Sequence, residues 1–149
     1  MQNPSRKKFV ITLLSIIFGS LIILGGSITA LVLHLVRTEV TGNLLVDGST
    51  FTINKCRSGQ VFGFYGIQLS DAAGRRLKVI EDQTDGKVTV SLFPANQDTG
   101  DILGNCVALH MRLQNSRVNY IANVGGAATF DCGTGNHKVV GDVNFTNCH

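Results

Sequence analysis

The residues from Phe9 to Leu33 carry no charged side chain over 25 consecutive positions, and they directly follow the basic cluster Arg6-Lys7-Lys8. A transmembrane helix needs roughly 20 consecutive apolar residues, so this run is long enough to cross a bilayer once. It is apolar on every side, whereas a helix packed on a soluble domain keeps a polar face. The sequence therefore predicts a membrane-spanning helix over residues 9–36.

A cleaved signal peptide is the main alternative for this segment. Its apolar region is about 7–15 residues long and ends in small residues of the Ala-x-Ala type. The run here is longer, and Ile28 stands two positions before Ala30. The first cysteine, Cys56, lies far beyond the run, so no acylated lipoprotein cysteine closes it. We therefore expect an uncleaved signal anchor.

The flanking charges predict the direction of insertion. Four basic residues and no acid lie in residues 1–37, whereas nine basic and ten acidic residues lie in residues 38–149. Because positive segments stay on the cytoplasmic side, residues 1–8 are predicted to be a cytoplasmic tail. Residues 37–42 are then a linker, and residues 43–149 form a domain facing the periplasm or the exterior.

The charge of this outer domain also bears on its partners. The net charge of +3 comes from the membrane-flanking residues, and the outer domain is close to neutral. The sequence shows no basic stripe with interleaved aromatic residues, which is the pattern expected of a nucleic-acid surface. We therefore expect the lipid bilayer and a membrane or envelope protein as partners, and no nucleic acid.

All four cysteines follow the apolar run, and an even number in an oxidising compartment predicts two disulfides. Three pairings are possible. Cys132 and Cys148 are close in sequence and flank an expected hairpin, which favours a bridge between them and leaves Cys56 for Cys106.

Short apolar runs separated by glycines predict an all-β domain, either an antiparallel sandwich or a small barrel of about eight or nine short strands. Asp47-Gly48 is typical of a tight hairpin turn. The alternation over residues 106–114 predicts a half-buried strand with Val107, Leu109, Met111 and Leu113 facing the core. The longest break, at residues 94–104, is the best candidate for a functional loop. The remaining expected strands cover residues 44–46, 49–53, 61–69, 75–80, 87–93, 118–122, 127–132 and 138–146.

Two constellations could carry chemistry. Cys132, His137, Cys148 and His149 are of the residue types that bind zinc, but the paired Cys-x2-Cys spacing of compact zinc motifs is absent. A nucleophile at Cys106 with His110 would need a free thiolate. Disulfide formation competes with both, so we expect no catalytic, cofactor or metal residue.

Several segments resemble a known group of proteins. Cys56-Arg57-Ser58-Gly59, Gly74-Arg75-Arg76-Leu77 and the closing Phe145-Thr146-Asn147-Cys148-His149 look like the small exported β-domain proteins and lipoproteins of myxobacteria and related delta-proteobacteria. The resemblance covers about residues 42–149. It implies a periplasmic domain, but transfers no catalytic residue. This chain departs from the lipoprotein members because it lacks the acylated cysteine.

These features predict a single-span, membrane-anchored and non-catalytic interaction or accessory subunit of a cell-envelope assembly. The alternative is an extracytoplasmic ligand-binding or metal-binding domain, or an enzyme, that uses the region from Cys132 to His149.

Overall fold

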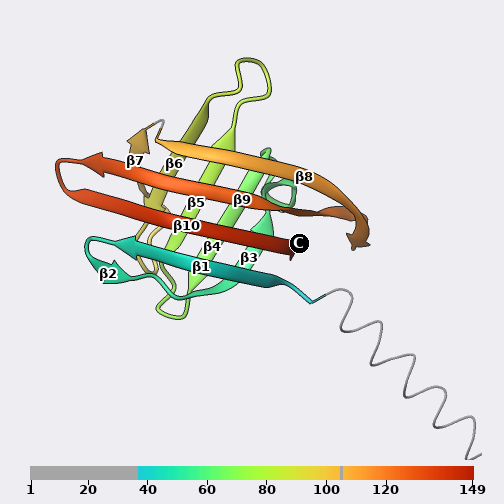
Figure 1. The fold of residues 1–149 in the computed structure, drawn as a ribbon, viewed down its shortest axis with the longest axis horizontal. Coiled ribbons are helices and arrows are strands. Elements are labelled where there is room, and N and C mark those ends of the chain that lie inside the picture. Colours follow the sequence, from blue (N-terminus) through green and yellow to red (C-terminus); the bar gives the residue numbers. More distant parts are fainter. Residues whose placement is uncertain (1–36, 105) are drawn as a thin grey trace, which may run out of the picture. The chain divides into compact units, whose positions relative to one another are not determined.

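The computed structural model describes residues 37–104 and 106–149, so the predicted span over residues 9–36 lies outside the described part. Within that part, no helix combines the length and the apolar character that a membrane crossing requires. Residues Thr38–His149 form one compact unit. The unit is all-β, as predicted, and consists of two five-stranded antiparallel sheets packed as a sandwich (Figure 1).

The first sheet, here called sheet A, joins the two ends of the domain. Its strand order is β2-β1-β10-β9-β8. The strand bounds are Glu39–Val46 for β1, Ser49–Thr50 for β2, Val107–Val118 for β8, Ile121–Thr134 for β9 and His137–Cys148 for β10. The first strand therefore lies beside the last one, with Glu39 opposite Thr146.

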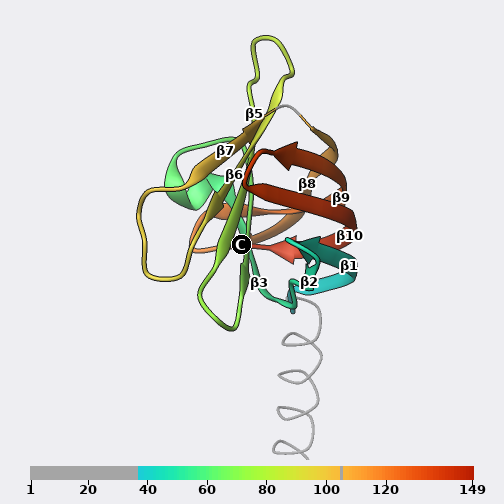
Figure 2. The same ribbon diagram turned by 90° about the vertical axis from the view of Figure 1, so that its left-hand side faces the viewer.

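The second sheet, sheet B, is a simple meander in the order β3-β4-β5-β6-β7. Its strands cross over those of sheet A rather than running along them (Figure 1), and the two sheets form separate layers (Figure 2). The strand bounds are Ile53–Ser58 for β3, Gly66–Asp71 for β4, Arg76–Glu81 for β5, Val88–Phe93 for β6 and Asp101–Gly104 for β7.

The core lies between the inner faces of the two sheets. Alternation places every second residue of β5 and β6 inward, so that Leu77, Val79, Val90 and Leu92 are buried and their neighbours face out. Sheet A contributes Leu44, Val46, Val124, Phe130, Val139, Val143 and Phe145.

The expected hairpin at Asp47-Gly48 is confirmed. Both residues have positive φ angles, 54° and 75°, and Val46 pairs with Ser49 across the turn. Such a turn matches the twist of the two strands that it joins.

Four sequence-based boundaries are wrong. Residues 59–62 form a 3-10 helix, η1, rather than the start of a strand over 61–69, because Ser58 caps it and Gly63 ends it with a φ of 79°. Residues 118–122 contain a turn at Asn119-Tyr120. Residues 94–104 are not one loop, since β7 occupies the last four. The described residues contain ten strands rather than eight or nine, and β1 begins at Glu39, within the expected linker 37–42.

The alternation predicted for residues 106–114 holds only in part. Val107 is buried, and Leu109 and Met111 pack against the core. Leu113 is exposed, because the register between β8 and β9 shifts between Leu113 and Arg117.

Two disulfides form, as predicted, but the favoured pairing is wrong. Cys56 bonds Cys148, and Cys106 bonds Cys132, with Cα–Cα distances of 5.0 Å in both. Cys132 lies opposite Val139 in the β9–β10 hairpin. Cys148 is nine residues further along an extended strand, about 30 Å away at roughly 3.3 Å per residue, which no disulfide can span.

Candidate functional site

The residues expected to carry chemistry are not brought together. All four cysteines are bridged, and Cys132 and Cys148 belong to different bridges. Cys106 therefore has no thiol to pair with His110. Across residues 37–104 and 106–149, no group of three or more His, Cys, Asp or Glu side chains is placed to hold a metal ion.

His137 instead joins the two sheets at one end of the sandwich. Its Nδ1 lies 2.8 Å from an Asp47 carboxylate oxygen in the β1–β2 turn, and its Nε2 lies 3.3 Å from an Asp101 oxygen at the start of β7. Only the imidazolium can donate to both carboxylates. The hydrogen bond with Asp47 is the main cause that raises the pKa of His137. The pKa of Asp47 is lowered, chiefly by the backbone N–H of Lys138, which donates to it, and then by His137.

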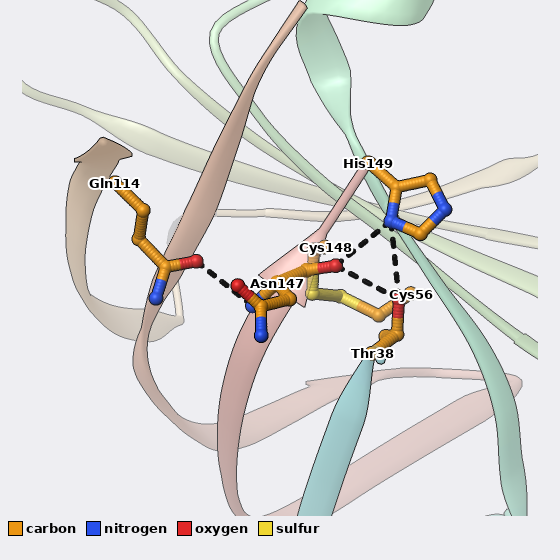
Figure 3. Close-up of a disulfide and its surroundings, with 6 residues drawn as sticks. All are labelled: Thr38, Cys56, Gln114, Asn147, Cys148 and His149. Atoms are coloured by element: carbon orange, nitrogen blue, oxygen red, sulfur yellow. Dashed lines mark hydrogen bonds between the residues drawn. A yellow bond between two sulfur atoms is a disulfide. The ribbon is translucent and has the colours of Figure 1, made fainter. Parts of the chain in front are cut away.

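At the opposite end, the start of β1 is tied to the C-terminus (Figure 3). The Thr38 hydroxyl donates to the Asn147 carbonyl at 2.8 Å and lies 3.3 Å from Nδ1 of His149. The Asn147 N–H donates to the Gln114 side chain at 2.8 Å. The adjacent Cys56–Cys148 disulfide links this end of sheet A to sheet B. Thr38, the first residue of the domain, therefore lies at a corner that a disulfide bridges between the two sheets.

The most distinctive surface is the outer face of sheet B. Two rows of side chains cross its first four strands, because the register of β3, β4, β5 and β6 aligns alternate residues. The facing residues are Arg57, Gln68, Lys78 and Ser91 in one row, and Lys55, Ser70, Arg76 and Phe93 in the other.

Aromatic rings lie among these cations. Lys78 lies over the ring of Phe93 at 4.6 Å and near Phe64 at 6.0 Å, while Arg76 lies over Phe93 at 5.2 Å. Arg57 lies 6.0 Å from the ring of Phe62. These distances are within the range of cation–π attraction. The four cations Lys55, Arg57, Arg76 and Lys78 and the three rings Phe62, Phe64 and Phe93 are called the basic face below.

Carboxylates compensate this charge only weakly. Asp98 contacts Arg76 at 3.4 Å, but its side chain is fully exposed, and an exposed pair of this kind contributes little. Among the described residues, Lys55, Arg57 and Lys78 have no ion-pair partner. The basic face therefore presents positive charge to an incoming anion.

A hollow of about 430 Å³ opens in the basic face. Gln68 is 94% buried, since only 6% of it is exposed, yet its amide makes no hydrogen bond to any other described side chain or backbone group. Its amide atoms keep access to solvent through the hollow, since the one buried side-chain atom without a partner among the described residues is Asn123 Oδ1, so this amide is available to a ligand that displaces water. The hollow, called the Gln68 hollow below, is lined by Asn54, Lys55, Arg57, Phe62, Gln68, Ser70, Asp71, Ala72, Gly74 and Arg76.

Two segments border the basic face. The η1 segment and the β6–β7 connection both project from sheet B on the side away from sheet A (Figure 2). Arg76 donates to the Gln97 carbonyl in that connection. The front part of the loop predicted at residues 94–104 therefore flanks the basic face.

The expectation that the outer domain has no basic stripe with interleaved aromatic residues is wrong. The cations come from β3 and β5 and the rings from η1, its connection and β6, so no continuous sequence segment shows the pattern. One signal was present: Lys55 with Arg57, and Arg76 with Lys78, are spaced two apart and so share a face of their strands.

A larger open groove of about 640 Å³ lies between the end of sheet B and the strands β8, β9 and β10. Tyr65 and Glu81 line one side of it, and Leu109 and Met111 line the other. It combines a single acid with a single cation, Arg112, alongside apolar side chains. Its lining therefore favours no particular ligand charge.

Comparison of the chain with protein-family models, curated proteins and solved structures gives no match. The resemblance to exported β-domain proteins therefore stays a prediction. What the geometry itself defines is a class: a disulfide-linked β-sandwich with a cationic and aromatic outer face.

Proposed function

We propose that this chain is a membrane-anchored, non-catalytic binding subunit of a cell envelope, with residues 9–36 as the anchor and the β domain outside the cytoplasmic membrane. The single observation that carries the proposal is the basic face. A surface that holds four cations and three rings with few acidic partners supports a binding role, because a cleft of one charge sign concentrates ligands of the opposite sign and exposed apolar patches mark interaction sites.

The disulfides and the attachment corner support this proposal. Two bridges in one small domain are typical of an oxidising compartment. The preceding segment joins sheet A at Thr38, beside the Cys56–Cys148 bridge. A tether attached there pulls on a corner that is cross-linked to both sheets.

The bridged cysteines favour a binding role over the alternative that uses the region from Cys132 to His149. A sulfur in a disulfide is neither a thiolate nucleophile nor a zinc ligand. His137 is engaged by Asp47 and Asp101, and His149 lies against Thr38 and Asn147.

Native co-purification tests the proposal. The tagged full chain is extracted from its own membranes with a mild nonionic detergent, in parallel with Arg57→Gln/Arg76→Gln. Arg117→Gln/Lys138→Gln is the matched control, because it removes two exposed positive charges from sheet A instead. We expect a membrane-fraction component that accompanies the wild type and the control but not the basic-face variant. A single monodisperse monomer, or recovery of the chain in the soluble fraction, would contradict the proposal.

A further inference from the structure

We propose that the Gln68 hollow binds an acidic saccharide, meaning a ligand that carries sugar hydroxyl groups together with a carboxylate or a phosphate. This inference rests on the proposed function, since it names the ligand class of the same face. The juxtaposition that carries it is an almost fully buried glutamine, whose amide opens to the hollow without a protein partner, among three cations and one exposed phenyl ring.

The acidic group of the ligand is required by the charge of the hollow. Arg57, Arg76 and Lys55 line it. The one acid in the lining, Asp71, is already occupied: its oxygens accept from the backbone N–H of Arg75 at 2.8 Å and from the Arg75 guanidinium at 2.6 Å. Guanidinium groups bind carboxylates and phosphates through paired hydrogen bonds, so an oxyanion is the complementary group.

The hydroxyl groups of the ligand are required by Gln68 and Ser70. A glutamine amide presents both donors and an acceptor, and a serine hydroxyl does the same on one atom. Both face the hollow between the cations of β3 and those of β5. A fully ionised inorganic anion offers no donor to the amide oxygen of Gln68, whereas a sugar hydroxyl can donate to that oxygen and accept from the amide N–H.

The ring of Phe62 provides the third part of the site. It is 41% exposed and lines the same hollow. Ligand pockets commonly combine such an apolar wall with a few orienting polar groups, and the C–H face of a pyranose can cover this ring.

The basic face also allows the ligand to be longer than one sugar. Lys78 and Phe93 continue the two rows beyond the hollow. The cations of β3 and β5 are two strands apart, which is about 10 Å at the usual strand spacing. An extended acidic glycan could therefore present a second acidic group to Lys78.

A nucleic acid fits this arrangement less well. Binding to its backbone depends on many phosphate contacts along a basic groove. Residues 38–149 have ten acidic and nine basic side chains, and three of these cations, Lys55, Arg57 and Arg76, line the hollow. An acidic peptide would satisfy the cations, and its backbone N–H and C=O groups could pair with Gln68 and Ser70, so a peptide comparison is needed to distinguish the two ligand classes.

The test measures binding to the full chain in a polyoxyethylene detergent, which is uncharged and contains no sugar. Tri-galacturonate is the carboxylate probe, and mannose 6-phosphate is the phosphate probe. Maltotriose, triglutamate and a short oligothymidylate are the neutral, peptide and nucleic-acid comparisons. We expect one or both acidic saccharides to bind, with maltotriose at least tenfold weaker, as the loss of a hydrogen bond to a charged group implies roughly 10- to 100-fold.

Three variants locate the site. Arg57→Gln should weaken binding about tenfold or more, and Gln68→Met should weaken it about 2- to 10-fold, since Met keeps the volume but removes both hydrogen-bonding groups. Arg117→Gln should leave binding unchanged. Circular dichroism of each variant verifies that the sandwich is folded.

Several outcomes would overturn the inference. Equal binding of triglutamate or oligothymidylate would show that the face recognises charge alone. Absence of binding by both acidic saccharides at millimolar concentration, or an unchanged affinity in folded Gln68→Met, would also refute it. If these tests fail while co-purification still depends on Arg57 and Arg76, the saccharide assignment is wrong and the proposed function stands. If saccharide binding is found but no membrane component depends on the face, the proposed function is wrong.

Discussion

The two disulfides should differ in how much they stabilise the domain. The Cys56–Cys148 bridge spans 92 residues, and the Cys106–Cys132 bridge spans 26. Loop-closure entropy then gives a loss of about 4.6 kcal/mol on removing the first bridge and about 3.5 kcal/mol on removing the second. Cys56→Ser/Cys148→Ser should therefore lower the free energy of unfolding more than Cys106→Ser/Cys132→Ser.

A third variant separates the observed pairing from the one favoured by sequence spacing. Cys132→Ser/Cys148→Ser removes one sulfur from each bridge, so it breaks both and should lose about 8 kcal/mol. A loss of that size is comparable to the whole stability of an ordinary domain, about 5–15 kcal/mol. This variant should therefore be much less stable than either variant that lacks one bridge.

Urea unfolding of the full chain in a nonionic detergent measures these losses. The chain has no tryptophan, so far-UV circular dichroism is the suitable signal. If Cys132→Ser/Cys148→Ser loses no more stability than a variant that lacks one bridge, the observed pairing is wrong. Peptide mapping of unreduced protein gives an independent check, because Cys56 and Cys148 should be recovered in one linked peptide.

Two further predictions concern single residues. Because the pKa of His137 is raised above its ordinary value, its stabilising effect should be fully present below about pH 6.5 and lost as the pH rises through the raised value. The melting temperature should therefore be higher at pH 5.5 than at pH 8. This difference should shrink in His137→Asn but persist in the control His110→Asn, which alters an exposed histidine on β8. An undiminished pH difference in His137→Asn would contradict the assignment. Tyr120 has a φ of 68° and is 97% exposed at the β8–β9 turn. Tyr120→Gly should stabilise the domain by about 1 kcal/mol in urea unfolding, because glycine relieves the strain of the left-handed backbone. Unchanged or lower stability would show that no strain is stored there.

The fold class was predictable because the strands obey simple alternation. Val88, Val90 and Leu92 alternate with polar residues, and the structure buries these three. Asp47-Gly48 predicted its hairpin because both residues tolerate positive φ angles. Tyr120 shows the limit of such reasoning. A bulky residue is unfavourable in a left-handed turn, so residues 118–122 were predicted to be a strand, although the chain reverses there.

For a similar reason, the segment Val61-Phe62-Gly63-Phe64-Tyr65 was wrongly predicted to be the start of a strand. Its β-branched and aromatic residues favour a strand. Its first two residues instead end the 3-10 helix η1, which begins with the hydrogen bond from the Gln60 N–H to the Ser58 hydroxyl and ends at the left-handed Gly63, whose N–H donates to the Gln60 carbonyl. This local override places Phe62 beside Arg57 and creates one wall of the hollow.

The sequence could predict each pair of cations in the candidate site, but not that the two pairs lie together. The spacing of Lys55 and Arg57, and of Arg76 and Lys78, places each pair on one face of its strand. Their meeting depends on the register of β4 between them, which brings Gln68 opposite both Arg57 and Lys78. Strand register across three strands follows from packing and turns rather than from local spacing, so the site emerges only in the structure.

Site-specific photo-crosslinking in native membranes tests most directly whether the basic face is the binding surface. Benzoylphenylalanine is placed at Phe62 on the basic face and, as a control, at Leu113, an exposed apolar position on sheet A. We expect irradiation to give a cross-linked species from position 62 that disappears in the Arg57→Gln/Arg76→Gln background, and none from position 113. Equal cross-linking from both positions, or cross-linking confined to position 113, would contradict the account.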